Sequence, residues 1–251
     1  MASTSTVSNN PVLRRIGTDA PAASAVPMTV AGTVAKTAGL LGLVVLTGAA
    51  SWWSLGSGRF PPTLLMPVML GSVVVGLGLA IWISFRPLVA RWAGPLYAIC
   101  QGVALGLISA AVNAQYKGLP LMAVGLTAGT FWAMLGAYRS GLIKVTDRLR
   151  AIVVGLTGGI AIFYLIAIGV QVFGGFTIPF LVESGPLAIG FSLFVTGLAA
   201  FNLLLDFRAI EEGVAAGAPT DYEWAFATGV VITLVWLYLE LLRLLSYFNR
   251  N

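Results

Sequence analysis

Long apolar runs separated by short polar segments make up the chain from about residue 31 onward. Each run is long enough to cross roughly 30 Å of hydrocarbon as an α-helix, and almost every charged residue falls between the runs. Segments such as GSGRFPP, KGLP and RSGLIKVTDR supply turn-forming residues between them. The pattern predicts seven transmembrane helices, at about 34–55, 64–85, 95–115, 120–138, 151–173, 186–207 and 224–247.

Composition supports the same interpretation and divides the chain into two parts. Apolar residues make up 58% and charged residues 9%, against roughly 25% charged in soluble domains. Residues 1–30 are rich in Ser, Thr, Ala and Asn, and are expected to form a mobile tail. Residues 31–251 are expected to form one all-α, multi-pass transmembrane domain, a seven-helix bundle in the lipid bilayer of a cell (plasma or inner) membrane.

The positive charges predict the orientation. Ten Lys and Arg residues fall on the side of the tail and four on the other side. Basic residues favour the cytoplasm, so the N-terminus is expected to be cytoplasmic and the C-terminus outside. The ten are Arg14, Arg15, Lys36, Arg86, Arg91, Arg139, Lys144, Arg148, Arg150 and Arg208; the four are Arg59, Lys117, Arg243 and Arg250.

Pairs of glycines at GxxxG spacing occur in spans three, four and five. They are Gly102 with Gly106, Gly125 with Gly129, and Gly155 with Gly159. This spacing lets helix backbones approach closely. It predicts that these three spans form an internal bundle.

Several chemistries are excluded by residues that the sequence lacks. There is no histidine, which removes serine–histidine hydrolysis, HExxH metalloproteases and histidine-ligated haem. There is also no GxGD motif, and the three lysines lie at span ends or in loops, where none could hold retinal. We expect no catalysis, no resident cofactor and no nucleic-acid partner.

The acidic residues inside the spans are the functional candidates, because a charge in hydrocarbon is expensive. Asp206 ends span six, with Asn202 one turn earlier, and Glu240 lies deep in span seven. Two carboxylates in a low-dielectric bundle cannot both be charged cheaply, so such a pair can respond to pH without histidine. Their oxygens are also suitable ligands for Ca²⁺.

The same acids have structural interpretations. Asp206 can mark the cytoplasmic end of its helix, and Arg243, one turn after Glu240, can neutralise that carboxylate while its side chain extends outward. The predicted boundaries place the two acids roughly 20 Å apart in depth. They can approach only if span six continues through Arg208-Ala209-Ile210 and span seven effectively starts near Gly229.

Two segments carry a resemblance to a known family. LLLDFRAIEEG (Leu203 to Gly213) and LVWLYLELLRLLSYF (Leu234 to Phe248) resemble the last two helices of the Bax inhibitor family, the transmembrane Bax-inhibitor-motif proteins, in its bacterial branch. YAICQGVALGLIS in span three is a looser match. The resemblance implies a seven-helix bundle whose last helix is central.

The resemblance also implies functions. Bacterial relatives are described as pH-sensitive Ca²⁺ leak channels, in which an acid pair senses pH. That role carries over to Asp206 and Glu240, which are then also the expected Ca²⁺ contacts. Arg86 corresponds to an arginine that latches the sixth-helix acid. Gln101 stands where many relatives have a glutamate and is a possible polar lining residue, as is Asn202.

The alternative is a non-conducting regulator. One bacterial branch of the family modulates a membrane-bound quality-control protease through a cytoplasmic tail. The tail at 1–30 would then bind that protease or another membrane protein.

Overall fold

The computed structural model describes residues 26–174 and 185–250. These residues contain seven helices long and apolar enough to cross a membrane, which confirms the predicted all-α, seven-helix architecture. The helices are α2 (Val30–Gly56), α3 (Leu65–Phe85), α4 (Ala90–Gln115), α5 (Leu119–Arg139), α6 (Asp147–Gly174), α8 (Pro186–Ala215) and α9 (Tyr222–Arg250). Short 3₁₀ turns, Pro62–Leu64 and Pro87–Val89, precede α3 and α4.

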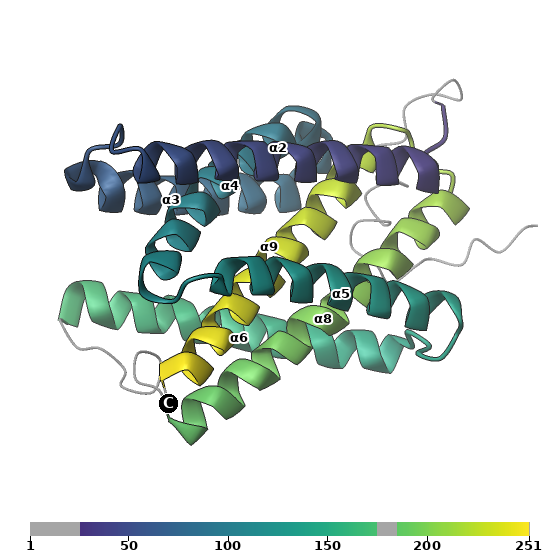
Figure 1. Cartoon of the computed structure of the whole chain (residues 1–251). Coiled ribbons are helices and arrows are strands. Elements are labelled where there is room, and N and C mark those ends of the chain that lie inside the picture. Colours follow the sequence, from purple (N-terminus) through teal and green to yellow (C-terminus); the bar gives the residue numbers. More distant parts are fainter. Residues whose placement is uncertain (1–25, 175–184, 251) are drawn as a thin grey trace, which may run out of the picture.

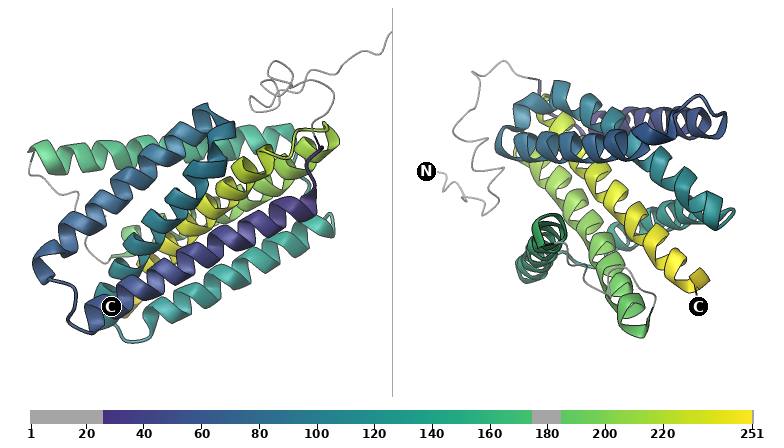
Figure 2. Two further views of the ribbon diagram at one scale, coloured as in Figure 1. Left: turned by 90° about the horizontal axis from the view of Figure 1, so that it is seen from above. Right: turned by 90° about the vertical axis from the view of Figure 1, so that its left-hand side faces the viewer.

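The last helix, α9, lies at the centre of the bundle, as the family resemblance predicted. It runs obliquely between α2, α3 and α4 on one side and α5, α6 and α8 on the other (Figures 1 and 2). In its most apolar stretch 67% of the residues are buried, against 6% in α6. Its leucines and valines, among them Leu234, Leu237 and Leu241, belong to the main apolar clusters. The end of the bundle where α9 begins is called the N-terminal side below.

The GxxxG prediction holds for one of the three spans. Gly102 and Gly106 on α4 lie against the backbone of α2, where a Cβ added at Gly102 would be 2.5 Å from the Val44 carbonyl oxygen. The glycines of spans four and five have open space within 4 Å, and the most apolar stretches of α5 and α6 are only 17% and 6% buried. The predicted internal bundle of spans three to five is therefore wrong, since α5 and α6 present these glycines to the surroundings rather than to another helix.

The sixth span is longer than the sequence predicted. α8 continues from the expected end near residue 207 to Ala215. Its extra turns carry Arg208, which forms ion pairs with Glu212 on the same helix at 2.6 Å and with Asp147 of α6 at 2.8 Å. Because these charges neutralise one another, the helix can extend beyond its apolar part. Gly217, with φ of 64°, then turns the chain toward α9.

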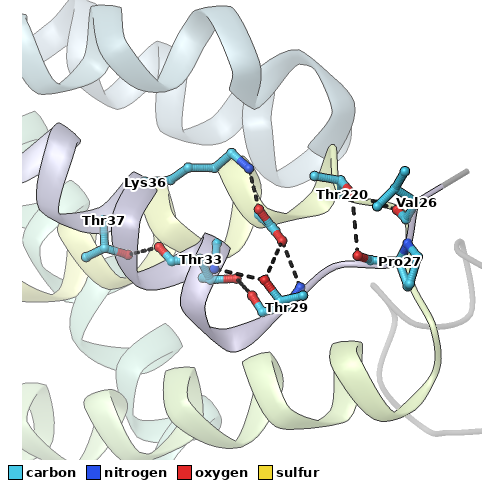
Figure 3. A network of polar contacts seen from close by, with 9 residues as sticks. Val26, Pro27, Thr29, Thr33, Lys36, Thr37 and Thr220 are labelled. Atoms are coloured by element: carbon cyan, nitrogen blue, oxygen red, sulfur yellow. Dashed lines mark hydrogen bonds and ion pairs between the residues drawn. The ribbon is translucent and has the colours of Figure 1, made fainter.

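Residues 26–29, which the sequence interpretation assigned to the tail, pack against the loop between α8 and α9. The Met28 amide donates to the Ala218 carbonyl oxygen at 2.7 Å, and the Thr220 amide donates to the Val26 carbonyl oxygen at 2.9 Å. The Met28 side chain is only 2% exposed and belongs to the core cluster around α8 and α9. This short segment therefore fixes the start of α2 to the start of the central helix (Figure 3). Residues 1–25 lie outside the described residues.

Candidate functional site

Asp206 lies where α8 packs on the first half of α9. A Cβ added at Gly229 would be 4.0 Å from Asp206 Oδ1, so the carboxyl group faces the α9 backbone at a position with no side chain. Thr233, one turn further along α9, is its polar neighbour. Oδ2 is buried and has no hydrogen-bond partner among the described residues. The site therefore contains a carboxyl group with a buried oxygen and no cationic partner in the part of the chain that the structure describes, an arrangement that costs free energy whenever the acid is charged.

Asn202 lies one turn before Asp206 and connects α8 to α6. Its amide nitrogen donates to Thr157 Oγ1 at 2.8 Å and to the Leu198 carbonyl oxygen at 2.9 Å. The shared helix face of Asn202 and Asp206 was predicted from their spacing. The contact with Thr157 was not, because a single threonine in an apolar span carries no distinct signal.

Glu240 belongs to a second polar cluster further along α9. Its side chain is buried and accepts hydrogen bonds on Oε1 from the Tyr164 hydroxyl at 3.2 Å and from Trp236 Nε1 at 3.3 Å. Arg243 forms an ion pair with Oε2 at 2.6 Å. The guanidinium also donates to the Tyr164 hydroxyl and lies 5.3 Å from the centre of its ring. This arrangement agrees with the structural interpretation in which Arg243 neutralises Glu240, and it adds Tyr164 and Trp236.

The structure does not bring Asp206 and Glu240 together. α8 does continue through Arg208-Ala209-Ile210, as contact required. However, Asp206 faces Gly229 and Thr233, and Glu240 lies seven residues beyond Thr233, about 10 Å along the helix axis. The Glu240 oxygens are bound by Tyr164, Trp236 and Arg243 instead.

Two further candidates form no hydrogen bond or ion pair with either acid among the described residues. Arg86 is the C-cap of α3; its side chain is exposed and forms no ion pair in the part of the chain that the structure describes. Gln101 is buried on α4, where it faces α3: a Cβ added at Gly76 would lie 3.2 Å from its Cδ. The structure thus joins neither residue to Asp206. Within the described ranges no three acidic or cysteine side chains gather as metal ligands would.

Sequence reasoning missed a third buried acid, Glu223, in the first turn of α9. It is 3% exposed, forms an ion pair with Lys36 of α2 and accepts a hydrogen bond from the Thr29 amide at 2.7 Å. Thr29 and Lys36 are drawn in Figure 3. A Cβ at Gly32 would lie 2.5 Å from the Glu223 carboxyl carbon, so the absence of a side chain there makes room for the acid. The pair spans 187 positions of sequence, and local spacing gives no sign of it.

Six apolar helices around a central seventh helix, with carboxyl groups buried inside the bundle, define the described part of the chain as a multi-pass membrane protein with polar sites in its interior. The chain belongs to the Bax inhibitor 1 like family, whose model matches residues 10–250. This confirms the family resemblance drawn from the last two helices. No curated protein and no solved structure matches the chain.

Proposed function

We propose that this protein is a pH-regulated cation (Ca²⁺) leak channel of a cell membrane, and that Asp206 is its pH-sensing group. The observation that carries the proposal is the buried Oδ2 of Asp206 at the contact between α8 and α9, which has no hydrogen-bond partner within residues 26–174 and 185–250. A charged carboxylate there requires water, a cation or a moving helix to compensate it. Gain or loss of one proton therefore changes the stability of this helix contact. Membership of the Bax inhibitor 1 like family supports the assignment.

The proposed path follows the polar side chains that lie beyond Asp206 between α6, α8 and α9. Asn202 with Thr157 comes first, followed by Tyr164 with Glu240 and Arg243. Polar side chains inside a membrane bundle typically mark such pathways. The arrangement corresponds to a closed state, because Arg243 neutralises Glu240 and the Glu240 oxygens are already bound. Opening requires a displacement of α6 or α9 that admits water.

Under this proposal the other candidate residues, Arg86 and Glu240, act only in a second conformation that differs from the one in the structure. Arg86 latches Asp206 there, since its exposed side chain forms no ion pair among the described residues. Glu240 contacts Ca²⁺ only after Arg243 moves away. Ca²⁺ is the transported ion, and the proposal contains no catalytic step or resident cofactor.

The test is Ca²⁺ flux into proteoliposomes over a pH series. Wild type and Asp206→Asn are compared with empty vesicles and with Asp221→Asn, a matched control that neutralises an exposed acid in the α8–α9 loop. We expect flux above empty vesicles, a pH profile flattened by Asp206→Asn, and an unchanged profile for Asp221→Asn. Absence of flux from folded wild-type protein at every pH, or equal profiles for the two variants, would contradict the proposal.

The non-conducting regulator remains a second candidate because of the packed segment before α2. Met28 and Thr29 are bound to Ala218 and Glu223, so a partner that pulls on the tail would act directly on α9. Deleting residues 1–25 leaves these contacts in place. Under this candidate the deletion abolishes binding to a membrane protease or other membrane partner, whereas Asp206→Asn does not.

A further inference from the structure

A polar surface pocket of about 450 Å³, wide open to the surroundings and called the first cavity below, lies on the N-terminal side of the bundle beside the connection from α5 to α6. An adjoining cavity of about 420 Å³ extends it along the end of α8. The first is lined by Tyr138, Arg139, Gly141, Ile143, Lys144, Val145 and Glu211. Its volume is within the range of sites for small ligands. Neither Asp206 nor Glu240 lines either cavity.

Most charges around the two cavities are already paired within the protein. Arg208 binds Asp147 and Glu212, and donates to the Val145 carbonyl oxygen at 2.5 Å. Arg150 lies 3.7 Å from Glu212. These groups hold α6 against α8. They leave little unbalanced charge for a ligand.

Three charged groups of the first cavity are not paired in this way. Arg139 and Lys144 are exposed and form no ion pair in the described ranges. Glu211 accepts a hydrogen bond from the Tyr138 hydroxyl at 2.5 Å but has no cationic partner among the described residues. Within the described ranges the cavity therefore offers two cations and one carboxylate that have no ion-pair partner. The two cations can bind a phosphate group through charge-assisted hydrogen bonds, and the carboxylate can bind an ammonium group in the same way.

The position of the cavity indicates that a lipid supplies these groups. It lies where α5 ends and just before α6 begins, at the edge of two membrane-spanning helices. Leu142 lies in the same connection and is 81% exposed, although it is a large apolar side chain. Such a residue next to basic side chains is typical of a segment at the boundary of headgroups and acyl chains.

We infer that the cavity between the α5–α6 connection and the end of α8 binds the headgroup of an aminophospholipid. Arg139 and Lys144 contact its phosphate, Glu211 contacts its ammonium group, and Leu142 enters the acyl boundary. This site is separate from the proposed cation path and does not depend on it. Glycerol headgroups lack the ammonium, and choline headgroups carry an ammonium that cannot donate a hydrogen bond to Glu211.

The test is native mass spectrometry of the full chain in detergent with phospholipids of identical acyl chains. Ethanolamine, serine, choline and glycerol headgroups are compared by the apparent Kd of the first bound lipid. We expect an amine-bearing headgroup to bind about threefold or more tightly than choline and glycerol headgroups. Arg139→Gln with Lys144→Gln should weaken binding of all four headgroups about threefold or more, because all four carry the phosphate. Lys117→Gln, a control on the opposite side of the bundle, should leave these affinities unchanged.

The Glu211→Gln variant distinguishes specific recognition of the amine from non-specific binding of anionic lipids to the basic residues. We expect it to lose the preference for amines while retaining binding of the glycerol headgroup. Equal binding of all four headgroups by wild type, or an amine preference that survives Glu211→Gln, would overturn the inference. Unchanged affinities for all four headgroups in the Arg139→Gln, Lys144→Gln variant would overturn it as well. Displacement of lipid by free phosphoethanolamine at a similar concentration would also overturn it, because the ligand would then be a soluble phosphate compound.

Discussion

Adding one methyl group at Gly102 of α4 tests the close contact between α2 and α4. In Gly102→Ala the new Cβ would lie 2.5 Å from the Val44 carbonyl oxygen and would also meet Thr47. An ordinary carbon–oxygen contact is about 3.5 Å, so the two backbones must separate by about 1 Å. Overpacking usually costs about 1–3 kcal/mol. A cost near the upper end is expected here, because a backbone carbonyl cannot rotate away as a side chain can.

The measurement is the free energy of unfolding in mixed micelles, obtained by titration with a denaturing detergent and followed by circular dichroism. Gly125→Ala is the matched control, since its new methyl group would meet nothing within 4 Å. It should remain within about 1 kcal/mol of wild type, as expected for an open helix position. If Gly102→Ala were as stable as Gly125→Ala, the α2–α4 contact would not exist in the folded protein.

Three further predictions concern the buried polar groups. Lys36→Met should lower the free energy of unfolding by about 3 kcal/mol, because it leaves the buried Glu223 carboxylate without its cation. Glu223→Gln should cost less, because the Lys36 side chain it leaves unpaired is partly exposed to water. The double variant should lose less than the sum of the two, and strict additivity in a double-mutant cycle would argue against the pair. Gly32→Ala should lower the melting temperature, because the new methyl group displaces the Glu223 carboxylate. Gly39→Ala on the same helix should lower it less, because its methyl group would meet nothing within 4 Å, and equal melting temperatures of the two variants would contradict this prediction. Tyr164→Phe should lose about 1 kcal/mol, because it removes the hydroxyl shared by Glu240 and Arg243 and keeps the ring; an unchanged stability in the same detergent titration would show that the hydroxyl is not used.

The sequence predicts the helices well because hydrocarbon imposes a simple rule. A span must be long and apolar, so seven runs yield seven helices. The boundaries are less certain where charges can pair outside the apolar region. Arg208 was expected to end span six, but Asp147 and Glu212 neutralise it and α8 extends to Ala215.

The arrangement of the helices is harder to predict than their number. GxxxG spacing marks a helix face on which a second helix can pack closely, but it does not indicate whether a second helix packs there. Gly102 has α2 against it, whereas Gly125 and Gly155 have open space.

The sequence predicts which acids lie inside the bundle, but it does not predict which side chains they contact. Asp206 and Glu240 stand out because charges are rare in spans, and the approximate depth difference already argued against contact. Their neighbours Thr233, Tyr164 and Trp236 are residue types that are common in membrane spans, so the sequence does not single them out and only the helix packing identifies them.

The central position of α9 has a consequence for how the protein is made. α9 is translated after the six other spans of the described chain, yet it contributes residues to each of the three apolar clusters of the core. Before α9 is inserted, α2, α3 and α4 can already pack on one another, but Lys36 still lacks the carboxylate to which it later binds. Insertion of the final helix then joins groups 187 positions apart in one step. The two groups of helices on either side of α9 are therefore expected to join into one bundle only after α9 has entered the membrane.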